Sequence, residues 1–196
     1  MLCGWNVLPC SAYRKEPPFP SHYAARHPDR VSRLVLQGGY VQGWRKRGTA
    51  EQITQRETLM SLIPGGWGQN NPAFRQVYTS LFMPGGTLEE MQWFNDLQRV
   101  STSPDNAVRL QSAFGEIDVA GLLPHVATPT LVLHSRGDAL IPFEQGLMLA
   151  RAIPNARFVA LESQNHLLVA HEPAWRRLVD EMCAFLTEAD TNGGKP

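Results

Sequence analysis

The chain has 196 residues, 43% of them hydrophobic, and eighteen basic side chains balance eighteen acidic ones, so its formal net charge is zero. This length predicts one domain with room for an inserted subdomain, and the hydrophobic fraction is ordinary for a globular protein. The balanced charge argues against a nucleic-acid or anionic-membrane partner, because both attract a basic excess, and no apolar run approaches the length of a membrane span.

The N-terminal segment, residues 1–21, shows neither the strand period nor the helix period. Pro17, Pro18 and Pro20 oppose a regular helix there, so we predict an irregular segment. The segment does not begin with charged residues followed by a long apolar core, which argues against a signal peptide.

The three cysteines, Cys3, Cys10 and Cys183, are scattered along the chain and odd in number. This pattern predicts reduced thiols in a cytoplasmic protein. A disulfide between Cys3 and Cys10, or half of a metal site, remains the alternative.

Residues 22–43 are predicted to start the α/β core. The stretch His22–His27 has the character of a helix end that Pro28 stops. Val31–Leu36 is rich in valine and leucine and is bounded by Gly38-Gly39, which is typical of a strand buried in a parallel sheet.

Residues 44–115 change character and predict a cap of about four short helices. Thr49–Gln52 and Thr87–Glu90 both have the capping-box pattern, in which a hydroxyl and a side chain three residues later cover free helix amides. Asn71-Pro72 and Ser103-Pro104 each place an N-cap residue before a proline at the first helical position.

Two Gly/Pro stretches, Pro64–Gly66 and Pro84–Gly86, are predicted to be loops between the cap helices. Neither is a phosphate-binding loop, because no Gly-Lys-Ser/Thr follows. The aromatic residues of the cap are expected either to pack the helices together or to line a pocket. They are Trp67, Phe74, Tyr78, Phe82, Trp93, Phe94 and Phe114.

Residues 116–188 return to alternating strands and helices, and residues 189–196 form a polar tail. The predicted elements are a strand over Thr130–His134, a helix over Phe143–Ile153, a strand over Arg157–Leu161 and a last helix from Glu172-Pro173. With Val31–Leu36 these strands predict an α/β fold with a mostly parallel sheet of about three strands.

Two polar residues, Asp138 and His166, follow the last two predicted strands. In parallel sheets the working groups sit at the carboxyl ends of the strands. A hydrolytic histidine needs one ring nitrogen facing the nucleophile and the other held by an acceptor, which a buried carboxylate provides. The pair therefore predicts the acid and the base of a catalytic triad.

Each residue also has a simpler interpretation. Asp138 follows Gly137, and its simpler interpretation is a turn aspartate. The simpler interpretation of His166 is a loop histidine bonded to a backbone carbonyl. His171 lies near His166 in the sequence, but no third ligand supports a zinc site. The position of both residues at strand ends, in the order acid then histidine, favours the triad interpretation.

Three stretches of the chain resemble the C-terminal part of the α/β-hydrolase fold family. Residues 23–40 resemble the helix after the nucleophile and the next strand. Residues 129–146 resemble the acid loop, with its D-x-x-[IV]-P pattern at Asp138–Pro142. Residues 156–175 resemble the histidine loop, although the family more often has Gly where this chain has Asn165. The closest likeness is to the esterase and peptidase-like branch, including hydrolase modules of bacterial regulators.

The chain departs from this family at the nucleophile. Nowhere does it contain the Gly-x-Ser-x-Gly sequence, whose small residues allow the strained turn that exposes the serine. The corresponding region reads Ser11–Glu16, and neither Ser11 nor Ser21 is expected to replace the missing serine. The switch to family-like sequence at His22 predicts a truncated, frameshifted or alternatively started gene product.

The resemblance implies an incomplete α/β-hydrolase fold with an inserted helical cap. It implies hydrolysis of a carboxylic ester or related acyl bond of a small molecule, in which Asp138 orients His166, and it implies no cofactor and no metal. The alternative is a catalytically inactive hydrolase-like fragment that binds a ligand or a partner. The strand Val31–Leu36 would then be an exposed sheet edge, open to self-association.

Overall fold

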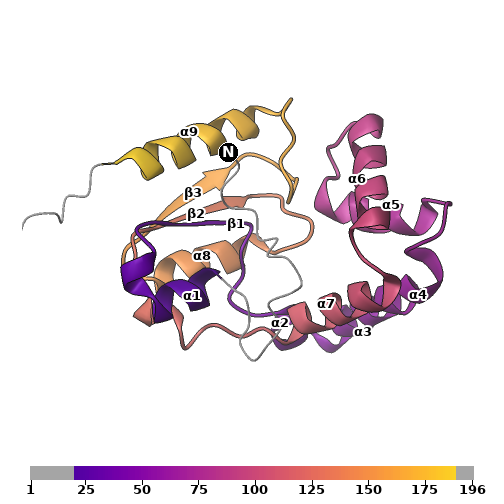
Figure 1. The fold of residues 1–196 in the computed structure, drawn as a ribbon, viewed down its shortest axis with the longest axis horizontal. Helices are drawn as coiled ribbons and strands as arrows, with labels where there is room; N and C mark the ends of the chain where they lie inside the picture. The colour runs from indigo at the N-terminus through magenta and orange to yellow at the C-terminus, as the bar shows by residue number, and fades with distance from the viewer. Residues whose placement is uncertain (1–19, 189–196) are drawn as a thin grey trace, which may run out of the picture.

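The computed structural model describes residues 20–188 and contains a parallel sheet with helices on both faces (Figure 1). The strands are β1 (Leu34–Gln37), β2 (Thr130–Ser135) and β3 (Ala156–Leu161), and they lie in the spatial order β1-β2-β3. Both pairings are parallel, and the register sets the first residues of the strands level with one another. The predicted α/β class and the parallel three-stranded sheet are confirmed.

The central strand β2 is buried along its whole length, which explains its uninterrupted apolar run. Successive side chains of a strand point to opposite faces. Val132 therefore packs into the core beneath α1 (Pro20–Arg26) and α8 (Phe143–Ala152), while the residues on either side of it pack against α9 (Pro173–Thr187). Figure 1 shows α9 on one face of the sheet and α1 with α8 on the other.

Several predicted boundaries need correction. The strand predicted over Val31–Leu36 begins only at Leu34, because Pro28–Arg30 forms the 3-10 helix η2, whose last bond runs from the Val31 amide to the Pro28 carbonyl (3.5 Å). Helix α1 starts at Pro20, inside the segment predicted to be irregular, because a proline costs no hydrogen bond in the first helical turn. The rest of that prediction, over residues 1–19, lies outside the described residues.

The insertion between β1 and β2 contains six α-helices in the described chain, so the prediction of about four was too low. The additions are two single-turn helices, one of which includes Pro64–Gly66, a predicted loop. Proline is tolerated there because it lies in the first turn. Pro84–Gly86 lies outside the helices, as predicted. The helices are α2 (Trp44–Arg47), α3 (Ala50–Ser61), α4 (Ile63–Gly66), α5 (Ala73–Phe82), α6 (Leu88–Ser101) and α7 (Pro104–Glu116), followed by the 3-10 helix η3 (Leu123–His125).

Three of the four predicted helix starts are confirmed by their hydrogen bonds. Thr49 and Thr87 both close complete capping boxes, with Gln52 and Glu90 respectively. The Ser103 side chain accepts from the amide three residues later. Asn71 instead accepts from the Ala73 amide at 3.0 Å, and the helix begins after Pro72 rather than at it.

The aromatic residues of the cap mostly pack its helices together. Trp67 and Tyr78 are buried in a cluster with Met60 and Ile63, and Phe74 packs against it. Trp93 and Phe114 are the exceptions, with 62% and 37% of their surface exposed. The packing interpretation therefore describes most of these side chains.

Strand β1 has a partner on one edge only within residues 20–188. The amides of Leu34 and Gly38 donate to the carbonyls of Pro129 and Leu133, at 3.0 Å each. Because backbone groups alternate along a strand, those of Val35 face the other edge.

Within residues 20–188, no helix is both long and apolar enough to cross a membrane. Cys183 is an exposed free thiol, while the predicted Cys3–Cys10 alternative lies outside the described residues.

Candidate active site

The acid loop and the histidine loop leave the same end of the sheet. The acid loop, residues 136–142, follows β2, and the histidine loop, residues 162–172, follows β3. The ladder continues past both strands, because the Arg136 amide donates to the Leu161 carbonyl and the Gly137 amide to the Ser163 carbonyl, at 2.9 Å each. These bonds hold the two loops side by side.

Asp138 in the acid loop and His166 in the histidine loop are in direct contact. His166 Nδ1 lies 2.8 Å from Asp138 Oδ2. The Asp138 side chain is fully buried, and the His166 side chain is 15% exposed. Since a carboxylate accepts, the imidazole carries its proton on Nδ1, which leaves Nε2 free to take a proton.

Asp138 is a turn aspartate as well as the partner of His166. Its second oxygen, Oδ1, accepts from the amides of Leu140 and Ile141 at 2.9 Å each. These two bonds close the acid loop on the carboxylate and fix the direction in which Oδ2 points. The simpler interpretation of this residue is therefore also correct, and the turn is what aims the carboxylate.

The charge state of Asp138 follows from opposing effects. Burial raises the pKa of this carboxyl group, but the hydrogen bond and charge of His166, together with the two loop amides, outweigh burial. The net pKa of Asp138 lies below its ordinary value, so the group is ionised at neutral pH. An ionised acceptor stabilises an imidazolium ion at His166.

His134 lies beneath the pair and was assigned only to a strand from the sequence. It is fully buried, and its Nε2 is 3.1 Å from the Ile141 carbonyl and 3.5 Å from Asp138 Oδ2. Burial lowers the pKa of this imidazole, so it is neutral at pH 7 and donates to the carbonyl. His134 thus ties the far end of the acid loop to β2.

Three residues that the sequence did not assign to the site hold His166. The Gln37 side chain donates to the His166 carbonyl at 2.8 Å. The carbonyl of Phe82, at the end of α5, accepts from the amides of His166 and Leu167 at 2.9 Å each, and the two rings meet edge to face. Gly38 has φ +60°, and a Cβ added there would lie 2.6 Å from the His166 ring. Of these contacts, only the one at Gly38 had a signal in the sequence, the glycine pair that follows the strand.

Asn165 occupies the position before the histidine and connects the loop to the cap. Its Oδ1 accepts from the Gly85 amide at 2.8 Å. Its Nδ2 donates to Glu172, which also accepts from the Ser163 hydroxyl and the Val169 amide. Because glycine has no side chain, this link exists only with the residue found here.

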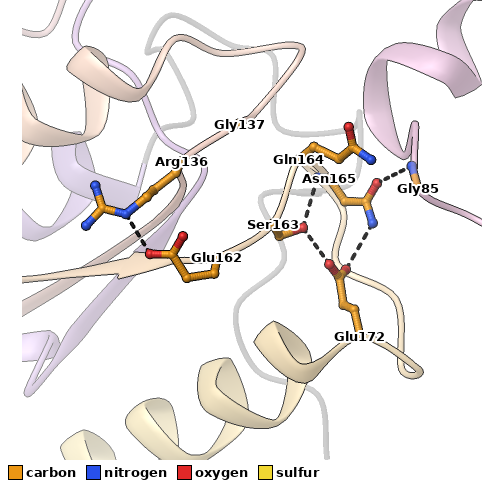
Figure 2. A pocket seen from close by; sticks show the side chains of 8 residues that line it. All are labelled: Gly85, Arg136, Gly137, Glu162, Ser163, Gln164, Asn165 and Glu172. Carbon is orange, nitrogen blue, oxygen red and sulfur yellow. Dashed lines mark hydrogen bonds and ion pairs between the residues drawn. The ribbon is translucent and has the colours of Figure 1, made fainter.

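An open hollow of about 520 Å³ is lined by Gly137 and Asn165, the chain neighbours of Asp138 and His166, but not by the pair itself (Figure 2). Arg136 and Glu162 in its wall form an ion pair at 2.6 Å, and Glu172 is bonded as described. Arg136 and Glu162 thus neutralise each other, whereas the Glu172 carboxylate accepts from uncharged groups. The lining residues are Gly85, Arg136, Gly137, Glu162, Ser163, Gln164, Asn165 and Glu172.

The described residues offer neither a metal centre nor a nucleophile in contact with His166. No cluster of three or more potential ligands occurs in residues 20–188. His171 instead pairs with Glu90 at 3.2 Å. Ser21 is buried in α1, and Ser11 lies outside the described residues. The two loops therefore bring together an imidazole and the carboxylate that orients it.

The known proteins that this chain resembles include several hydrolases. A family model described as "TAP-like protein" matches residues 102–193. "Putative carbamate hydrolase RutD" of Pseudomonas savastanoi pv. phaseolicola is 44% identical over 62 residues, which are 32% of this chain and 24% of the relative. The "2-hydroxymuconate semialdehyde hydrolase" of Pseudomonas putida is 27% identical over 85% of this chain and 58% of its own.

Among solved structures, the esterase EaEST from Exiguobacterium antarcticum superposes with a TM-score of 0.68 at 18% identity. The match covers 86% of this chain and 63% of the esterase, and at this identity it shows the fold alone. The chain thus spans between about a quarter and three fifths of the proteins it matches. The three parallel strands and these likenesses together show that the chain has an incomplete α/β-hydrolase fold.

Proposed function

We propose that this chain carries the acid and the base of a site that hydrolyses a carboxylic ester or a related acyl bond of a small molecule. The observation that carries the proposal is the 2.8 Å contact between His166 Nδ1 and a fully buried Asp138 carboxylate. His166 is the general base that activates a nucleophile and then the general acid that protonates the leaving group. Asp138 orients the ring and stabilises its charged form.

The names of the relatives support this reaction class. A carbamate and an ester both have a carbonyl carbon bonded to a heteroatom, and each is hydrolysed by attack on that carbon. The nucleophile in a Ser-Asp-His mechanism is a serine in Gly-x-Ser-x-Gly, which this sequence does not contain. Removing any triad member leaves only residual catalysis, so the chain is expected to need that serine from elsewhere. The predicted truncation stays a prediction, tested by the nucleotide sequence ahead of codon 22 in all three frames.

An ester assay tests the enzymatic proposal. The purified chain is given a series of p-nitrophenyl esters beside a His166→Ala variant. A rate that disappears in His166→Ala supports the proposal. A rate that survives the substitution, or no rate at all, rejects catalysis by the chain alone.

The second candidate is a catalytically inactive binding or interaction fragment. It is favoured by the open edge of β1 within the described residues, because an unpaired strand edge is a template for another strand. Sedimentation at several protein concentrations tests this candidate. An association that Val35→Pro weakens supports pairing through the edge, while a monomer at every concentration rejects it. The cytoplasmic location and the division into core and cap at residues 43 and 116 stay predictions.

A further inference from the structure

The basic residues of helix α2 divide into two kinds. Arg45 lies 3.4 Å from Glu57 and 3.5 Å from Glu116, and Lys46 lies 3.4 Å from Glu116. Arg47, the last residue of the helix, has no carboxylate within ion-pair distance among residues 20–188. Its Nη1 donates to the Gln42 carbonyl at 2.5 Å, and its guanidinium lies 5.3 Å from the centre of the Tyr40 ring.

Arg56 on the next helix is in the same situation. Its guanidinium lies 5.9 Å from the centre of the Tyr78 ring, and its Nη2 has a 3.4 Å contact with the Gln111 amide oxygen. Within the described chain it has no ion-pair partner. We call Tyr40, Arg47, Arg56 and Tyr78 the arginine–tyrosine cluster.

Two polar atoms of this cluster have unused hydrogen-bonding capacity. Arg56 Nε and the Tyr78 hydroxyl are both buried, and neither has a hydrogen-bond partner among the described residues. Arg75, elsewhere in the cap, also has a buried Nε without a partner, but its Nη1 donates to the carbonyls of Trp67 and Gln69, so backbone oxygens stabilise its charge. Buried charges in proteins are normally paired, so an unpaired donor set indicates a missing acceptor.

The charge balance of the cluster points the same way. Burial lowers the pKa of Arg47 and of Arg56, and the charge of Arg56 further lowers that of Arg47. The Asp138 carboxylate opposes this effect at Arg47, which places the cluster within electrostatic reach of the acid and base. A bound anion would relieve the repulsion between the two arginines.

We propose that Arg47, Arg56 and the Tyr78 hydroxyl bind the carboxylate of a small organic acid. Guanidinium groups match the planar geometry of a carboxylate, and charge-assisted bonds of this kind are the strong ones. The tyrosine rings favour a carboxylate on an apolar chain over a fully hydrated inorganic anion. The inference deepens the proposed function by giving the acyl substrate a second, anionic end, and it rests on the proposed function for the identity of that ligand as a substrate.

The test uses binding to the full chain of 196 residues and needs no turnover. Sodium butyrate is titrated while the arginine Nε–Hε signals are followed by nitrogen-15 NMR, and butyramide serves as the neutral isostere. The signals of Arg47 and Arg56 are expected to move saturably with butyrate and to stay in place with butyramide. The paired Arg45 is expected to stay in place with both.

Variants then assign the effect. Arg47→Gln and Arg56→Gln are each expected to raise the Kd for butyrate by about tenfold or more, the loss of a charge-assisted bond. Arg45→Gln is the matched control and is expected to leave the Kd unchanged. The wild-type titration decides the question even if a variant fails to fold.

Several results would overturn the proposal. They are the absence of saturable shifts, equal shifts with butyramide, or an unchanged Kd in both Arg47→Gln and Arg56→Gln. Tighter binding of inorganic phosphate than of butyrate would reject the carboxylate assignment. His166→Ala separates the two proposals, because it removes the proposed general base but is expected to leave butyrate binding intact.

Discussion

Buried charges are paired in the acid and histidine loops but not in the arginine–tyrosine cluster. In the loops, both oxygens of Asp138 are bonded, and the backbone of His166 is held by Gln37 and Phe82. In the cluster, two guanidinium groups lack an acidic partner within residues 20–188, and Arg56 Nε is buried without a hydrogen bond. The first region is organised without a ligand, whereas the second is completed only by one. Substitutions should therefore cost stability in the loops and little in the cluster.

The largest loss is expected from Asp138→Ala. It leaves two loop amides without an acceptor and His166 without its partner, which should cost roughly 2–4 kcal/mol of unfolding free energy. Urea denaturation measures this, with the exposed Asp180→Ala as the control, expected to change little. Equal effects at the two positions would show that the acid loop does not depend on its carboxylate.

A somewhat smaller loss is expected from Gly38→Ala. The new methyl group would lie 2.6 Å from the His166 ring in a backbone conformation with φ +60°, so the cost should be roughly 1–3 kcal/mol. Gly121→Ala is the matched control, because nothing lies within 4 Å of its added Cβ. Thermal denaturation compares them, and a Gly38→Ala variant as stable as the control would contradict the close packing of the ring.

The buried His134 predicts a pH dependence with a definite sign. Burial lowers its folded pKa, so below about pH 6.5 the unfolded chain takes up a proton that the folded chain does not. The free energy of unfolding should therefore fall as the pH drops below that value, until the lowered folded pKa is passed. Urea denaturation of the wild type and of His134→Gln at a series of pH values measures this. If the unfolding free energy had the same slope against pH in both proteins, the assignment to His134 would be contradicted.

The smallest effect is expected from Arg56→Met in the cluster. Because the arginine is unpaired, replacing it with an apolar side chain of similar length should change the unfolding free energy by less than about 1 kcal/mol, or stabilise the chain. Thermal denaturation without added anion measures this. A loss as large as that of Asp138→Ala would mean that Arg56 is a structural residue like Arg75.

The sequence was informative where local rules determine the result. Thr49 and Thr87 reveal helix starts, and the apolar run of β2 reveals a buried strand, because each signal is contained in a few neighbouring residues. Asp138 and His166 were found for a similar reason, since residues just past parallel strands share one edge of the sheet.

The partners of these residues were not visible, because they come from distant parts of the chain. Gln37 reaches across to the histidine loop from the strand before the insertion, and Phe82 reaches it from the cap. The Pro64–Gly66 turn was mistaken for a loop, because composition does not show that Phe74 packs against Gly66. Arg47 and Arg45 look alike in sequence, and only their surroundings distinguish them.

The central claim is that Asp138 holds His166 as a base with a free Nε2, and nitrogen-15 NMR of the imidazole tests it most directly. For neutral His166, the account predicts a proton on Nδ1 and none on Nε2, with this preference lost in Asp138→Ala. A neutral ring protonated on Nε2, or a tautomer that does not respond to Asp138→Ala, would contradict the account.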